Sequence, residues 1–452
     1  MRVWDENDSP SAWSAIAHFS TGLPDSEWKA QWIGYDAPGT EDLEAAGAAP
    51  LAKAHWIWYP EGNPREDVPK CKRLFRRIVT VPEGAVILNA SLLATADDGV
   101  AIWINGREVG SGQGGRNWKQ VEYYLVDALL HPGDNCIAVE VKNEAAAAGL
   151  LAALRITLRD GAAIECVSDV SWKSARLLPG DDWRNAGYDD SDWEQVAVLA
   201  PFGEAPWTES RLEKARFKPV AHLRHEFTAK KDVKRATLYA SALGIYEAYL
   251  NGERVGDLYF TPGWTDFRKR VYYHTYDVTG LVRPGAENTL GALLSNGWYA
   301  GHLSWKGPEI YGTCPRFRAQ LEIEYADGAT DTIITDESWR AAHGEIRGAD
   351  LQMGETRDQR KALTGWDQPD YDDAAWTPAT ATAPEIVPGK MQPHPGPPVR
   401  QFENIMAKRF NEPRPGIYIY DMGQNLVGWT RITLAGKPDQ TIRVRHTEML
   451  EE

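Results

Sequence analysis

Two adjacent aspartates, Asp97 and Asp98, are the residues of this chain whose type and spacing point most directly to chemistry. Calcium is bound by about six to eight oxygen atoms from carboxylates, amide side chains and backbone carbonyls. Together with the amide oxygen of Asn143, the two carboxylates predict a Ca²⁺ site in which Asp97 is the main ligand. The alternative is a solvated loop that carries two acids.

Trp118 lies in the loop 111–120, which is rich in Gly and Gln. The chain has 19 Trp and 18 Tyr against 10 Phe, and Trp and Tyr combine a flat apolar face with a polar edge. Because sugars present C–H faces and hydroxyl edges, we expect Asp97, Asp98 and Trp118 to bind a sugar beside the cation. A β-sandwich core that uses many Trp residues would explain the same composition.

Other kinds of site find little support in the sequence. It contains no Gly-rich phosphate loop, His-Glu-x-x-His or Gly-x-Ser-x-Gly motif, and its four cysteines form no Cys-x-x-Cys pair. The net charge of −15 argues against nucleic acid as a partner. No apolar run approaches the ~18 residues of a membrane span, and no secretory signal is seen at the start. We therefore expect a cytoplasmic chain with no membrane partner.

An internal repeat provides the elements that must position the candidate site. Residues 101–110 (AIWINGREVG) match residues 247–256 (EAYLNGERVG), and further matches follow in the same order. These are residues 123–127 with 273–277, 132–135 with 284–288, Asn143 with Asn296, 168–172 with 335–339, and 188–193 with 371–376. The Asn-Gly pairs predict type I′ turns between two strands. We infer two copies of one β-sandwich.

Short strand signals between turn residues dominate the rest of the chain, which predicts an all-β fold of tandem sandwiches or jelly rolls. We expect residues 1–30 to be the last part of an immunoglobulin-like or fibronectin-like sandwich and 31–54 to be a linker. The first copy should span 55–207 and the second 215–385, and 395–452 should form an incomplete sandwich.

The two copies differ at the candidate site. Alignment of Asn105 with Asn251 places Asp97 and Asp98 opposite Leu243 and Gly244. The second copy lacks carboxylates at this position, so we expect it to be a structural sandwich without a metal.

Several motifs resemble the N-terminal half of bacterial α-L-rhamnosidases, glycoside hydrolases of family 78. They are residues 28–34 (WKAQWIG), 246–256, 261–264 (TPGW), 276–279, 296–301 (NGWYAG) and 421–429. The first copy is similar to the rhamnose-binding module of some members, in residues 56–62 (WIWYPEG), 95–98 (TADD), 105–106 and 201–207. The resemblance implies an Asp-Asn pair that binds rhamnose beside calcium, whereas this chain has Asp97-Asp98.

The resemblance also implies a catalytic (α/α)6 barrel that hydrolyses terminal α-L-rhamnosyl bonds with inversion by means of two carboxylic acids. We expect that barrel to follow Glu452, so no catalytic residue is assigned and the chain alone should be inactive. Its partners would be rhamnose-containing glycans and the missing catalytic domain. The alternative is a free-standing carbohydrate-binding protein that never had a barrel.

Overall fold

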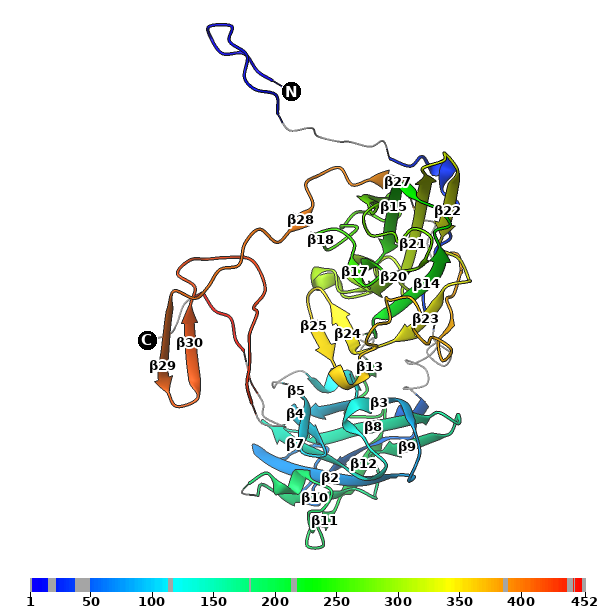
Figure 1. The fold of residues 1–452 in the computed structure, drawn as a ribbon. Helices are drawn as coiled ribbons and strands as arrows, with labels where there is room; N and C mark the ends of the chain where they lie inside the picture. The colour runs from blue at the N-terminus through cyan, green and yellow to red at the C-terminus, as the bar shows by residue number, and fades with distance from the viewer. Residues whose placement is uncertain are drawn as a thin grey trace. The chain divides into compact units, whose positions relative to one another are not determined.

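A computed structural model describes residues 2–14, 22–36, 49–112, 117–178, 180–212, 218–384, 389–436, 442 and 444–448. The chain divides into two compact units, Met1–Pro398 and Val399–Glu452. The predicted all-β fold is confirmed, since strands dominate and the described helices are short (Figure 1). In the described residues there is no helical barrel and no helix long and apolar enough to cross a membrane.

The first sandwich holds the candidate site and consists of two packed sheets. One sheet contains β12 (Ala197–Pro201), β1 (His55–Trp58), β8 (Gly149–Leu158), β3 (Ile87–Asp97), β6 (Gln120–Leu125) and β13 (Arg211–Leu212) in this order, with β9 (Ala163–Val167) beside β8. The other contains β11 (Glu194–Gln195), β10 (Lys173–Arg176), β2 (Cys71–Val81), β7 (Gly133–Asn143), β4 (Gly99–Ile104) and β5 (Arg107–Gly112).

The second sandwich has the same strand order. One sheet contains β26 (Thr377–Pro378), β23 (Arg340–His343), β14 (Ala221–Thr228), β20 (Glu287–Ser295), β16 (Ile245–Leu250) and β17 (Glu253–Arg254). The other contains β22 (Thr330–Ile334), β21 (Arg316–Tyr325), β15 (Val233–Leu243), β19 (Arg270–Asp277) and β27 (Lys390–Pro393). β27 runs parallel to β19 as β13 runs parallel to β6, so a parallel pairing is also repeated in the two sandwiches.

The remaining elements are short. They are the hairpin β24 (Ile346–Asp350) and β25 (Gly354–Arg357), β18 (Leu258–Tyr259), α2 (Gly297–Ala300), and the 3₁₀ turns η1 (Asp25–Glu27), η2 (Asn117–Lys119), η3 (Asp127–Leu129), η4 (Asp182–Arg184), η5 (Ser304–Lys306) and η6 (Gln359–Lys361). In the second unit lie β28 (Val399–Arg400) and the antiparallel hairpin of β29 (Arg409–Arg414) and β30 (Ile417–Asp421), where Phe410 stacks on Tyr418.

The first strand of the second sandwich comes from residues 31–34, ahead of the first sandwich in the chain. Ile33 pairs with Phe317 and Gly34 with Thr380, much as Ile57 of β1 pairs with Leu150. The hydroxyl of Thr335 donates to Gln31 O at 2.6 Å, and the hydroxyl of Ser168 donates to His55 O at 2.7 Å. The first sandwich is thus inserted into the second after its first strand.

This arrangement differs from the linker that we expected at residues 31–54. Its described first residues complete a sheet of the second sandwich, and Ala30 and Ile33 are buried there. Trp28, which we had assigned to a preceding sandwich, packs edge-on against Tyr239 and Tyr273 of the second one. Residues 37–48, the centre of the expected linker, lie outside the described part of the chain.

The two Asn-Gly turns make the same hydrogen bonds in both copies. The side chain of Asn105 (φ 52°) donates to Leu129 O and Asn135 Oδ1 at 2.9 and 2.8 Å and accepts from Cys136 N at 2.9 Å. Asn251 (φ 55°) donates to Leu281 O and Asn288 Oδ1 and accepts from Thr289 N, at 2.8, 2.7 and 2.9 Å. An asparagine is suited to this place because it tolerates positive φ and offers both a donor and an acceptor.

Candidate functional site

Strand β3 delivers Asp97 to the outer face of its sheet. Side chains alternate between the two faces of a strand, and Leu92, Ala94 and Ala96 of β3 lie in the core between the sheets. Leu93 instead belongs to a second apolar cluster with Trp56 and Trp207. Asp97 has the parity of Leu93, so its carboxylate ends beside this tryptophan cluster rather than in the main core.

The carboxylate of Asp97 is buried, with 8% of the residue exposed, and its Oδ2 accepts a 2.9 Å hydrogen bond from Trp207 Nε1. Trp207 stacks on Trp56 with ring centroids 4.3 Å apart. Gly149 pairs with Asp97 in the sheet, and a Cβ at Gly149 would approach the Trp56 ring to 2.7 Å and the Trp207 ring to 2.9 Å. Glycine is therefore required for the two indoles to reach the end of β3.

Asp98 holds the end of strand β7 next to the same carboxylate. Its backbone N donates to Lys142 O at 2.9 Å, and its Oδ2 accepts from Glu144 N at 2.6 Å. Asp98 therefore binds the residues on both sides of Asn143, and this brings the three predicted metal-site residues, Asp97, Asp98 and Asn143, to one place in the fold.

Asn143 presents an oxygen without a protein partner. The residue is fully buried, and its Nδ2 donates to Val68 O at 2.8 Å and to Pro69 O at 3.3 Å. Its Oδ1 is buried with no hydrogen-bond partner in the structure. Buried side-chain acceptors are nearly always satisfied, so an unpaired amide oxygen on a residue whose two chain neighbours both bind Asp98 fits the donor set of a hard cation.

The loop that follows strand β7 already takes part in other backbone hydrogen bonds. In the stretch 145–148, Ala146 O already accepts from Val68 N at 2.7 Å. In the described part of the chain, no three His, Cys, Asp or Glu side chains are grouped as a metal site would require. A cation here would therefore depend on the amide oxygen of Asn143 and on oxygens of water or a ligand as well as on the two acids.

A positive charge near Asp97 and Asp98 would also be electrostatically favourable. Burial raises the pKa of Asp97 to about 7; the hydrogen bond from Trp207 lowers it, and the adjacent Asp98 raises it again. Near neutral pH the carboxylate of Asp97 is thus only partly ionised in the absence of a compensating cation.

Trp118 lies at the edge of the same tryptophan cluster. Its partly buried side chain packs against the group that contains Trp56 and Trp207, and its carbonyl accepts from Ser210 Oγ at 2.7 Å. The ammonium of Lys119 lies 5.2 Å from the centroid of its ring. The structure therefore places Trp118 against the cluster that contains Trp207, the hydrogen-bond partner of Asp97. Residues 113–116 of the Trp118 loop lie outside the described residues.

Sequence reasoning missed Trp207 as the partner of Asp97 and Gly149 as the space for it. Trp207 closes the segment 201–207 that carried part of the family resemblance, but a pairing across 110 residues is visible only in the fold.

In the second sandwich the equivalent position is filled by apolar side chains. Leu243 is fully buried in a cluster with Phe267, Tyr299 and Tyr311. Gly244 has a φ of 139°, and a Cβ there would lie 2.4 Å from Ser295 O. Hydrocarbon thus occupies the space that holds carboxylates in the first copy.

Comparisons with known proteins agree with the resemblance of the motifs. Residues 231–403 match the alpha-L-rhamnosidase N-terminal domain, and residues 411–452 match the bacterial alpha-L-rhamnosidase concanavalin-like domain. The chain is 43% identical to an alpha-L-rhamnosidase of Streptomyces avermitilis over 100% of its own length and 43% of that protein. It is 34% identical to an alpha-L-rhamnosidase of an Alteromonas species over 63% of its length and 30% of that protein.

A solved structure of the Streptomyces avermitilis alpha-L-rhamnosidase, complexed with L-rhamnose, shares the fold. The match has a TM-score of 0.69 at 41% identity and covers 94% of this chain and 40% of that one. The chain spans less than half the length of these relatives. By its sequence along its whole length and by its fold, the chain belongs to the bacterial α-L-rhamnosidase family and corresponds to an N-terminal, all-β portion of such a protein.

Proposed function

We propose that the first sandwich binds L-rhamnose through a calcium ion and serves as the carbohydrate-binding part of an enzyme that hydrolyses terminal α-L-rhamnosyl bonds. The second sandwich would act as scaffold for a catalytic domain. The observation that carries the proposal is the buried oxygen of Asn143, which lacks a hydrogen-bond partner although the next residue, Glu144, is bound by Asp98. The L-rhamnose complex of the relative from Streptomyces avermitilis supports the choice of sugar.

The roles of the residues follow from their contacts. Asp97, Asp98 and Asn143 would supply oxygens to the cation, which in turn can coordinate sugar hydroxyls and neutralise the two adjacent acids. Trp118 would offer an aromatic face to the C–H side of the sugar, worth about 1 kcal/mol. Asp97 is already oriented by Trp207, so it should contribute most.

Titration calorimetry of the whole chain with L-rhamnose tests the proposal. We expect a Kd on the order of 0.1–1 mM in calcium, and no measurable binding in chelator or for Asp97→Ala. Asp367→Asn, which changes a partly buried acid of the second sandwich, should leave binding unchanged. Equal binding in calcium and in chelator would show that the cation is not involved. Absence of rhamnose binding at saturating calcium would refute the site as a whole.

A further inference from the structure

The residues that precede strand β6 lie at the end of the strand that carries Asp97. Strands β3 and β6 are antiparallel, and Ala94 of β3 pairs with Glu122 of β6. A continuation of this register brings Trp118 and Lys119 to the end of β3, where Asp97 is the last residue. The 3₁₀ turn η2, which contains both residues, lies against β3. Trp118 is therefore within reach of a sugar held at Asp97.

A second segment contacts Trp118 from the edge of the sheet away from β3. Strand β13 runs parallel to β6 on that edge. Just before β13, the hydroxyl of Ser210 donates to Trp118 O at 2.7 Å. The same segment carries Trp207, whose indole donates to Asp97. The segment 207–210 thus connects the residue that orients Asp97 with the backbone of Trp118.

The side chain of Lys119 links these two segments and lies over the ring of Trp118. Its ammonium nitrogen is 5.2 Å from the ring centroid, within the ~6 Å over which the face of an aromatic ring attracts a cation. The same ammonium forms an ion pair with the carboxylate of Glu209. Glu209 therefore helps to hold the positive charge of Lys119 above the indole.

An ammonium group and a sugar cannot occupy one face of an indole at the same time. Trp118 is partly buried against the cluster that contains Trp56 and Trp207. Because 47% of the Lys119 side chain is exposed, its ammonium approaches the ring from the solvent side, where a sugar would also stack. A sugar that stacks on Trp118 must therefore displace Lys119 first.

We propose that Lys119, held by Glu209, is a latch on the sugar-binding face of Trp118 and that rhamnose displaces this latch when it binds. This inference rests on the proposed function. An exposed cation–π contact and an exposed ion pair are both weak. The latch therefore lowers the affinity for rhamnose by about two- to fivefold, and it keeps the indole covered while no sugar is bound.

Titration calorimetry of the whole chain with L-rhamnose at saturating calcium tests the latch. Lys119→Gln removes the positive charge, and we expect the Kd to fall about two- to fivefold. Glu209→Gln should give a smaller gain, because the ammonium is no longer held but can still reach the ring. The double variant Lys119→Gln/Glu209→Gln should bind as Lys119→Gln does, since Glu209 acts on sugar binding through Lys119.

The substitution Trp118→Leu separates the latch from other roles of Lys119. It removes the stacking face, so rhamnose should bind about fivefold more weakly. In the Trp118→Leu background, Lys119→Gln should have no further effect on the Kd, because the ring that the ammonium covers is gone.

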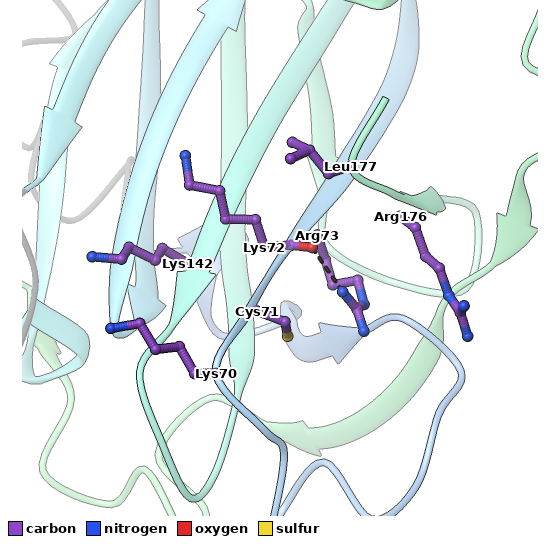
Figure 2. A pocket seen from close by; sticks show the side chains of 7 residues that line it. All are labelled: Lys70, Cys71, Lys72, Arg73, Lys142, Arg176 and Leu177. Atoms are coloured by element: carbon purple, nitrogen blue, oxygen red, sulfur yellow. Dashed lines mark hydrogen bonds between the residues drawn. The ribbon is translucent and has the colours of Figure 1, made fainter. Parts of the chain in front are cut away.

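Lys72→Gln is a matched control on the same sandwich. Lys72 also forms an ion pair with a glutamate, Glu140, and 44% of its side chain is exposed, against 47% for Lys119. It has the parity of Leu74 on the outer face of the other sheet, and it lines a pocket there (Figure 2). Because Asp97 lies on the opposite side of the sandwich, Lys72→Gln should leave the Kd unchanged. A gain equal to that of Lys119→Gln would trace the effect to net charge and overturn the latch.

Three other results would also overturn the latch and leave the rhamnose site standing. Weaker binding by Lys119→Gln would show that the ammonium contacts the sugar, and an unchanged Kd would show that it does not compete with the sugar. A gain that persists in the Trp118→Leu background would show that the ring is not involved. If the wild type binds no rhamnose at saturating calcium, the proposed function fails, and this inference fails with it.

Discussion

The indole of Trp207 donates its only hydrogen bond to the buried carboxylate of Asp97, at 2.9 Å, across 110 residues of sequence. This bond fixes the acid at the end of β3 and partly offsets the burial that raises its pKa. The tryptophan therefore orients the residue that we propose as the main calcium ligand, without any need to touch the cation itself.

Removal of this donor by Trp207→Phe should lower the free energy of unfolding by about 1–3 kcal/mol at neutral pH and weaken rhamnose binding, because the buried carboxylate loses its partner. Urea denaturation with and without calcium measures the cost. In an Asp97→Asn background the same substitution should cost less, since no charge remains to be satisfied. Equal costs in the two backgrounds would show that the indole contributes only by packing.

The pKa of Asp97, about 7 in the folded chain without metal, predicts opposite pH effects on binding and on stability. Calcium and rhamnose binding requires the ionised acid, so affinity should fall as the pH is lowered from 7.5 to 5.5. The unfolded chain has an ordinary aspartate pKa of about 4. Between pH 4 and 7 the folded state therefore holds more protons than the unfolded state, and the contribution of this group to stability falls as pH rises.

Denaturation of the metal-free chain at several pH values, compared with Asp97→Asn, isolates this contribution. The difference in unfolding free energy between the two proteins should change between pH 4 and 7 and level off above pH 7. Saturating calcium should abolish the loss of stability at the upper end. A difference that does not depend on pH would show that Asp97 ionises normally in the folded chain.

The resemblance to rhamnose-binding modules implies an asparagine at the position of Asp98, and Asp98→Asn should strengthen rhamnose binding. The amide oxygen can still accept from Glu144 N, the new NH₂ group can donate to a sugar hydroxyl, and the charge that raises the pKa of Asp97 is removed. Calorimetry at pH 6, where the effect on Asp97 is largest, should show a gain of about threefold or more. Asp98→Ala, which loses the bond to Glu144 N, should weaken binding; a similar gain in both variants would exclude the amide contacts as its cause.

The repeat could be predicted from the sequence because the motifs that define it are local. The Asn-Gly turns, the Pro-Gly turns and the Ser/Thr-Asp-x-Ser-Trp segments each form within a few residues and recur in order. The first strand of the second sandwich was missed although a signal exists: residues 29–33 read Lys-Ala-Gln-Trp-Ile, and residues 53–57 read Lys-Ala-His-Trp-Ile. We had read the chain as sandwiches in series, and an inserted sandwich breaks that assumption.

At the candidate site, residue types were predictable but partners were not. Asp97, Asp98 and Asn143 are brought together because β3 leads through Asp98 directly into β4, which pairs with β7. The hydrogen bond from Trp207 to Asp97 and the unpaired oxygen of Asn143 depend on packing between segments far apart in the chain. The local pattern of residue types carries no information about such contacts.

The equivalent turns at Asn105 and Asn251 allow each sandwich to be destabilised by a matched substitution. Each asparagine adopts positive φ and makes three side-chain hydrogen bonds. Alanine removes all three bonds and is strained at this φ, so Asn105→Ala or Asn251→Ala should lower the stability of its own sandwich by about 2–4 kcal/mol. Glycine at the same position relieves the strain but not the lost bonds, and it should cost less than alanine.

Hydrogen exchange read out strand by strand distinguishes the two sandwiches. Asn105→Ala should accelerate exchange in β3, β4 and β7 and weaken rhamnose binding, because Asp97 and Asn143 end two of these strands and Asp98 joins β3 to β4. Asn251→Ala should accelerate exchange in β15, β16 and β20 and leave rhamnose affinity at its wild-type value. If Asn251→Ala weakened binding as much as Asn105→Ala does, the two sandwiches would unfold as one cooperative unit. The insertion of one sandwich into the other would then couple their stabilities more strongly than their separate cores imply.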